Sequence, residues 1–258
     1  MGLEGEAMNS VVMSSIVFVC VFGGALFGIF LHDTLPQNHF TADSKEVIKL
    51  GMGLVATMSA LVLGLLVASA KNLYDAQSGA LTSMSARVVL LDRILAHYGP
   101  ETTEARTLLR GFVAVILDRM WPKGRASRSQ LEPPSADSEI IMDKIQKLSP
   151  VDDAQHSRKS QALDILLGLA QTRWLWFTQG VTSISLPMLA MLVFWLATLF
   201  VSFGLLAPSN ATVVGSLLVS AMSVSGAIFL ILELYTPYKG VIQISSAPLR
   251  AALAQLGK

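Results

Sequence analysis

The chain carries little charge for its length. Only 14% of its 258 residues are Asp, Glu, Lys or Arg, and 52% are hydrophobic, whereas soluble domains contain about 25% charged residues. The formal net charge is +1, so no basic field favours nucleic acid as a partner. A single cysteine, Cys20, excludes an internal disulfide framework and a multi-cysteine metal site. Because Cys20 lies inside an apolar run, we expect it to pack between helices.

The sequence signatures of common enzyme classes are also missing. The chain has no Gly-rich phosphate loop, no H-E-x-x-H and no G-x-S-x-G sequence. Its four histidines are scattered, and no two of them are four residues apart. Since no set of nucleophile, base or metal ligands is visible, we expect no enzymatic activity, no cofactor and no bound metal.

What the chain has instead is four apolar runs of about 20 residues or more, two on each side of a polar middle. They are Ser10–Leu31, Ile48–Ala70, Ile184–Leu206 and Val213–Leu232. About 20 helical residues, at 1.5 Å per residue, span a bilayer core of about 30 Å. The sequence therefore predicts an all-α integral membrane protein, with four transmembrane helices in a 2+2 arrangement around a helical cytosolic domain.

The distribution of basic residues predicts the orientation of these helices. Of the 19 Lys and Arg residues, 14 lie between Lys71 and Arg173, and three more follow the fourth run. Cytoplasmic segments carry the excess of positive charge, so we expect both termini and the middle in the cytoplasm, and the protein in the cell (inner) membrane. The predicted parts are an N-terminal tail (1–9), two spans (10–70), a cytosolic helical domain (71–183), two further spans (184–232) and a cytosolic C-terminal segment (233–258).

The middle of the chain has helical periodicity. The second span is expected to continue as one helix of about 50 residues to Tyr98, because only one Gly and no Pro interrupts it. Apolar residues recur along that extension at spacings of three and four, which is typical of a seam for a partner helix: Leu81, Met84, Val88, Leu91, Leu95 and Tyr98. Further helices are predicted at about 101–120 and 138–148, and from a capping box at Ser149–Asp152 to Phe177.

Two rows of residues distinguish the second span. One consists of small residues every four positions, which allow a neighbouring helix to approach closely: Ala56, Ala60, Gly64 and Ala68. The other is small or polar at its ends and apolar in the middle: Gly53, Thr57, Leu61, Leu65 and Ser69. Hydrophobic constrictions gate pores by dewetting, so copies packed around an axis would use Thr57, Leu61, Leu65 and Ser69 as pore lining. The alternative is that Leu61 and Leu65 face lipid or a packed core.

Charge follows this span directly. Lys71 and Asn72, repeated around a ring, would line a positive cytosolic vestibule that favours anions. Alternatively, Lys71 extends to the lipid headgroups as an ordinary anchor. Asp75, four residues further on, could also pair with Lys71 and cancel its charge.

Several segments resemble a known family. The run Leu61–Gln77, LVLGLLVASAKNLYDAQ, and the block Leu91–Pro100 resemble the bacterial bestrophin-like family, as do Pro237–Gly240 and Ala247–Ala251. The more distant resemblance is to bestrophins proper, which are pentameric ion channels with the same order of spans. That resemblance implies a pentamer whose second span lines the pore, with the narrow neck at Thr57, Leu61 and Leu65.

The chain departs from bestrophins proper after the fourth span. Tyr235 stands where they have an acidic residue, and Tyr238 replaces the Phe of their Pro-Phe pair. No acidic residue follows Glu233, so the calcium-binding cluster of animal bestrophins is not implied. Glu233 itself either joins a network with basic residues of the middle or faces water.

Two functions are compatible with these patterns. The first is an oligomeric bestrophin-like ion channel with a preference for anions, in which inorganic ions pass along the second span. The second is a non-conducting oligomeric scaffold or sensor, whose cytosolic helices bind a partner through the seam Leu81–Tyr98. Both place homo-oligomers in a lipid bilayer.

Overall fold

The computed structural model describes residues 10–35, 42–121, 135–179, 185–238 and 241–258. These residues are helical and contain no β-strand. The helices are α1 (Ser10–Thr34), α2 (Ala42–Tyr98), the short 3-10 helix η2 (Pro100–Thr102), α3 (Thr103–Met120), α4 (Ser135–Gln146), α5 (Asp153–Gln179), α6 (Leu186–Leu206), α7 (Ala211–Tyr235) and α8 (Ala247–Gln255).

Four of these helices, α1, α2, α6 and α7, are long and apolar enough to cross a membrane. They match the four predicted apolar runs, except that Ile184, the predicted start of the third run, lies outside the described residues. The prediction of an all-helical protein with four long apolar helices is confirmed. The predicted continuation of the second run is confirmed as well, because α2 is a single helix of 57 residues ending at Tyr98.

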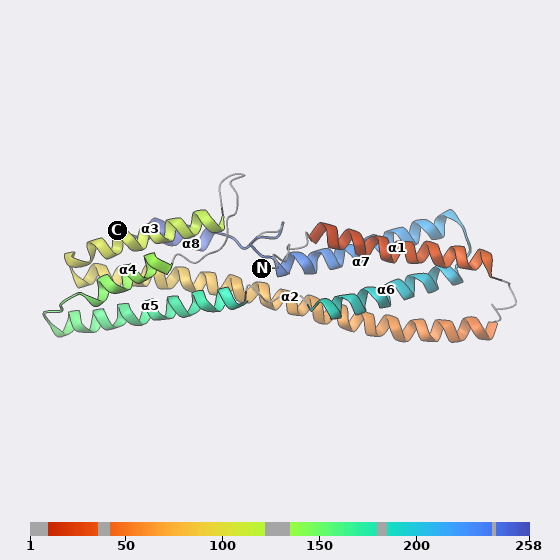
Figure 1. Ribbon diagram of the computed structural model, residues 1–258, viewed down its shortest axis with the longest axis horizontal. Helices are drawn as coiled ribbons and strands as arrows, with labels where there is room; N and C mark the ends of the chain where they lie inside the picture. Colours follow the sequence, from red (N-terminus) through yellow and green to blue (C-terminus); the bar gives the residue numbers. More distant parts are fainter. Residues whose placement is uncertain (1–9, 36–41, 122–134, 180–184, 239–240) are drawn as a thin grey trace, which may run out of the picture. The chain divides into compact units, whose positions relative to one another are not determined.

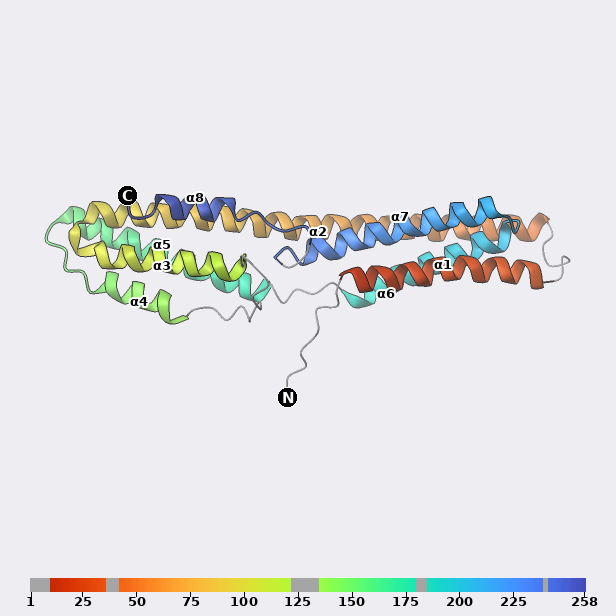
Figure 2. The same ribbon diagram turned by 90° about the horizontal axis from the view of Figure 1, so that it is seen from above.

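The chain forms two compact units. The first comprises residues 1–74 and 183–242, and the second comprises residues 75–182 and 243–258. Helix α2 contributes residues to both. In the first unit α1, α6 and α7 pack with the first part of α2, and in the second unit α3, α4, α5 and α8 lie along its second part (Figures 1 and 2).

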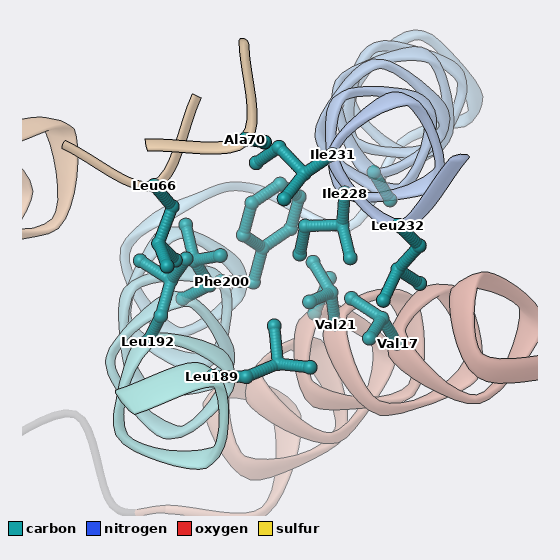
Figure 3. Close-up of a cluster of buried hydrophobic side chains, with 13 residues drawn as sticks. Val17, Val21, Leu66, Ala70, Leu189, Leu192, Phe200, Ile228, Ile231 and Leu232 are labelled. Carbon is teal, nitrogen blue, oxygen red and sulfur yellow. The ribbon is translucent and has the colours of Figure 1, made fainter. Parts of the chain in front are cut away.

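The core of the first unit lies where its four helices meet (Figure 3). Val17 and Val21 of α1 pack against Leu192 of α6 and Ile228 of α7, and α2 adds Leu66 and Ala70. Each of these residues is buried because it lies on the inward stripe of its own helix, at spacings of three or four.

Glycines allow α1 and α6 to approach each other closely. A Cβ atom built on Gly28 would overlap the Val201 carbonyl oxygen, and one built on Gly204 would lie 2.9 Å from the Ile29 nitrogen. This is the geometry in which a G-x-x-x-G sequence, here Gly24 and Gly28, brings two helix backbones together. The Ser225 hydroxyl of α7 donates a hydrogen bond to the Ser14 carbonyl of α1, at 2.6 Å, and so links the third helix to the pair.

The second unit is a helical bundle built around the predicted seam. All six seam residues of α2 are buried. Val88, Leu91 and Leu95 belong to one core with Leu109 of α3 and Ile141 of α4. Helix α5 adds Ala162 and Leu166, α8 adds Leu249, and Leu256 follows directly after α8. The seam is therefore covered by helices of the same chain, because the polypeptide folds back along α2.

A buried ion pair joins α2 to α3 in this unit. The Arg106 guanidinium donates to both carboxylate oxygens of Asp92, at 2.8 and 3.0 Å, and the Gly257 backbone N–H donates to the same carboxylate at 3.3 Å. Hydrogen bonding to Asp92 raises the pKa of Arg106 above its ordinary value. The Asp92 side chain is 1% exposed, so its charge depends on these donors.

Two sequence predictions are wrong in detail. The cap of α5 is Asp152, three residues after the predicted Ser149: its carboxylate accepts from the Gln155 N–H at 2.6 Å, and the Gln155 side chain accepts from the Val151 N–H at 2.9 Å. The two bonds resemble a capping box with Asp and Gln as its side chains, except that Gln155 accepts from the residue before the cap. Cys20 does not pack between helices, since its side chain is exposed on α1.

Candidate functional site

The first part of α2 has one buried face and one open face. Leu66 and Ala70, 3% and 0% exposed, point into the core of the first unit. On the opposite side Leu61 and Leu65 are 70% and 61% exposed. Only 11% of the apolar segment of α2 is buried, against 28%, 33% and 39% for α1, α6 and α7. Helix α2 is therefore the spanning candidate that its own chain covers least.

The predicted pore row follows the open face for most of its length. Thr57, Leu61 and Leu65 are exposed, and the Thr57 hydroxyl donates to the Gly53 carbonyl at 2.8 Å. That bond uses the hydroxyl proton of Thr57 and leaves both lone pairs of its oxygen able to accept hydrogen bonds from water. Ser69 is exposed at the edge of this face, and its hydroxyl accepts a hydrogen bond from the Tyr235 hydroxyl of α7, at 3.2 Å.

The row of small residues shares the open face. Ala60, Gly64 and Ala68 are exposed and Ala56 is half-buried. Among the described residues, no atom lies within 4 Å of a Cβ built on Gly64. The close helix contact of this chain is thus made at Gly28 and Gly204, and a close contact at Ala60, Gly64 and Ala68 would need another molecule. Whether the two rows line a pore and an interface stays a prediction.

The two vestibule residues follow at the end of this segment. Lys71 and Asn72 are both exposed. The Lys71 ammonium lies 5.7 Å from the centre of the Tyr74 ring, a distance at which a cation is attracted to an aromatic face. The ring therefore holds the ammonium group close to the helix.

Glu233 at the end of α7 has a different role from both alternatives that the sequence offered. Its side chain is buried, and its carboxylate accepts hydrogen bonds from the backbone N–H groups of Val241 and, at 3.3 Å, Ile242. Glu233 therefore fixes the chain after α7. Tyr238 lies in the same segment, and burial raises its pKa to about 12, so it stays neutral at physiological pH.

Sequence reasoning missed the buried polar contacts of the fold. In α7 the Ser223 hydroxyl donates to the Val219 carbonyl of its own helix, whereas the Ser225 hydroxyl makes the bond to α1. The apolar spacing was the available signal for Ser225, because it shares the inward stripe with Ala221 and Ile228. Groups of three or more potential metal ligands are absent among the described residues.

The fold and the open face of α2 define an all-helical protein with four helices able to span a membrane and a helical second unit. The bestrophin-like domain matches residues 19–249, and the chain belongs to the bestrophin-like family. The resemblance inferred from Leu61–Gln77 and Leu91–Pro100 is thereby confirmed. No curated protein and no solved structure matches the chain.

Proposed function

We propose that this protein is an oligomeric ion channel of the bestrophin-like family whose pore is lined by α2. The observation that carries the proposal is the open face of α2, where Leu61 and Leu65 are 70% and 61% exposed while the opposite face is packed. A helix that must line an axis has to keep one face free of its own chain. In the proposed assembly the four apolar helices span the bilayer, with both termini in the cytoplasm.

The chemistry of the open face suits a gated pore. Thr57 offers oxygen atoms, and Leu61 and Leu65 follow at one-turn intervals as apolar rings. A ring of leucines repels water when narrow and admits it when widened, which is how hydrophobic constrictions gate. The adjacent Gly64 and Ala68 have little or no side chain, so neighbouring copies of α2 can approach closely. A pentamer is the assembly that the resemblance to bestrophins proper implies.

The proposed ion preference rests on Lys71 and Asn72. Both are exposed beyond the apolar rings, and a ring of lysines would attract anions to that mouth of the pore. The contact of Lys71 with Tyr74 supports this role, because the ring attracts the ammonium group and holds it at this mouth of the pore. We propose no enzymatic activity for this protein.

The surface proposed for partner binding in the scaffold hypothesis is not exposed. Its binding surface was the seam Leu81–Tyr98, and α3, α4, α5 and α8 of the same chain cover that seam. Among the described residues of the second unit, no other feature specifies a partner. The channel is therefore the function that the geometry supports better.

Ion flux in proteoliposomes tests the proposal. We expect chloride to cross under an imposed gradient faster than potassium, and the double variant Leu61→Ala, Leu65→Ala to raise the flux by widening the constriction. The matched control is Val19→Ala with Leu26→Ala, since both residues are exposed apolar side chains on α1. Equal flux in all three proteins, with the oligomer intact by light scattering, would contradict the assignment of Leu61 and Leu65 as gate.

A further inference from the structure

The first unit contains a crevice between the beginning of α2 and the end of α6. It has a volume of about 180 Å³. Its walls come from one turn after another of the two helices: Ile48, Gly51, Met52 and Val55 of α2, and Thr198, Leu199 and Ser202 of α6. An apolar cavity of about 150 Å³ is large enough to bind benzene in another protein, so this crevice has room for a segment of a hydrocarbon chain.

The hydroxyl groups in the walls of the crevice do not need a polar ligand as a hydrogen-bond acceptor. The hydroxyls of Thr198 and Ser202 donate to carbonyls of their own helix, those of Phe194 and Thr198, both at 2.9 Å. Their hydroxyl protons are therefore already paired, and the methyl group of Thr198 and the methylene of Ser202 add apolar surface to the crevice. Gly51 opens the crevice on the α2 side: among the described residues, no atom lies within 4 Å of a Cβ built there. An apolar occupant fits these walls without leaving a buried hydrogen-bonding group unpaired.

Positive charge lies at one end of the crevice. Lys45 precedes Ile48 by three residues and Met52 by seven, so at 100° per residue it lies on the crevice side of α2, within about 20° of Met52. Lys49 lies next to that row, about 60° from Met52. The distance along the helix from Lys45 to Val55 is about 15 Å.

Negative charge in these turns lies on the other side of the helix. Asp43 and Glu46 are exposed, and they project about 180° and 120° away from Met52. The beginning of α2 is therefore sorted by charge, with cations above the crevice and anions above the open face that bears Leu50 and Leu54. An anionic group with a long apolar tail matches this arrangement.

We propose that the crevice binds one acyl chain of an anionic phospholipid whose phosphate lies at Lys45 and Lys49. The chain runs from the two ammonium groups past Ile48 and Met52 toward Val55, and it packs between α2 and α6. The inference rests on the insertion of these helices in a bilayer, which is part of the proposed function, but it does not depend on conduction. A lipid at this place would couple the position of α2 to the composition of the membrane.

The test measures phospholipid bound to the purified full-length chain. The protein is mixed in mild detergent with phosphatidylglycerol, or with phosphatidylcholine as the neutral probe, and bound lipid is counted by native mass spectrometry. Gly51→Leu and Ser202→Leu fill the crevice from its two sides, and Lys45→Ala with Lys49→Ala removes the charge. Gly23→Leu is the control, because no described atom lies within 4 Å of a Cβ on Gly23 either, and it lies on α1.

We expect the original chain and Gly23→Leu to bind phosphatidylglycerol in preference to phosphatidylcholine. Each filling variant should lower binding by about tenfold or more, since excluding about two methylenes already has that effect. The double Lys variant should abolish the preference between the two lipids.

Equal lipid binding in the filling variants and in Gly23→Leu would overturn the inference. The inference would also be overturned if a second copy of the chain occupies the crevice. In that case the original chain would bind no lipid, and Gly51→Leu would change the oligomeric state. Co-flotation with vesicles and ion flux, measured on the same preparations, separate this result from the proposed function. A chain that floats and conducts without bound lipid refutes the lipid site alone, and one that binds lipid without flux refutes the channel alone.

Discussion

Replacing Asp92 by Ala should destabilise the second unit strongly. The Asp92 and Arg106 side chains are 1% and 20% exposed and form two hydrogen bonds with each other. Without the carboxylate, the largely buried guanidinium keeps only its hydrogen bond to the Lys258 main-chain oxygen, at 3.1 Å. The loss of one partner of such a buried pair costs about 3–5 kcal/mol. The Gly257 N–H loses its acceptor at the same time.

Hydrogen exchange on the full-length protein in detergent is the appropriate assay. A loss of about 3 kcal/mol corresponds to an increase of more than a hundredfold in the exchange rates of amides in α3 that open with the unit. The matched control is Asp143→Ala, because Asp143 pairs with Lys147 at 2.5 Å on the surface of α4, where the two side chains are 57% and 72% exposed. That change should cost less than about 0.5 kcal/mol.

A double replacement tests whether the stability loss comes from the unpaired charge that remains in the single variant. Asp92→Leu combined with Arg106→Met removes both charges and keeps apolar volume, and substitutions of this kind are often neutral or stabilising. We expect exchange in α3 to return close to the rates of the original chain. If Asp92→Ala exchanges no faster than Asp143→Ala, the buried pair contributes nothing, and the account of how α2 and α3 are held together is wrong.

Two further changes test other contacts. Tyr98→Phe should stabilise the second unit by about 1 kcal/mol in hydrogen exchange, because the buried Tyr98 hydroxyl has no hydrogen-bond partner among the described residues. Burial raises the pKa of Tyr98 above its ordinary value of 10.0. The unfolded chain therefore releases this proton first, so the stability of the second unit is constant below that value and falls as the pH rises through the folded-state pKa. Tyr98→Phe should weaken that alkaline loss, and an unchanged pH profile of stability would contradict the prediction. Gly28→Val should lower the melting temperature in detergent, because the added Cβ would overlap the Val201 carbonyl. Gly23→Val is the control and should leave the melting temperature unchanged. Equal melting temperatures of the two variants would show that the α1–α6 contact is not close.

The sequence predicted those parts of the fold that depend on spacing along one helix. The apolar runs identified α1, α2, α6 and α7, and the alternation of three and four from Leu81 to Tyr98 identified a buried stripe. Spacing does not reveal what covers a stripe, so the same pattern suggested a partner protein where the chain uses its own helices. In the candidate site, periodicity located Thr57, Leu61 and Leu65 on one face, which the structure shows to be open.

The contacts that sequence reasoning missed join residues far apart in the chain. The bond from Ser225 to Ser14 spans 211 positions, and that from Gly257 to Asp92 spans 165. Nothing in the local sequence of either partner specifies the other. Glu233 accepts hydrogen bonds from residues only eight and nine positions ahead. The donors are backbone N–H groups, which carry no signature in the amino-acid sequence.

The central claim, that the open face of α2 lines an aqueous axis, is tested most directly by the accessibility of cysteines to a small water-soluble thiol reagent. In a chain with Cys20→Ala, a cysteine at Leu61 is compared with one at Val19, which lies near the middle of α1. The two positions are 70% and 66% exposed, so both are open in a single chain and differ only in what they face. The account predicts rapid modification at position 61 and none at position 19, where the side chain meets lipid. If both positions stay unmodified in an intact, membrane-inserted oligomer that carries ions, α2 does not line the pore.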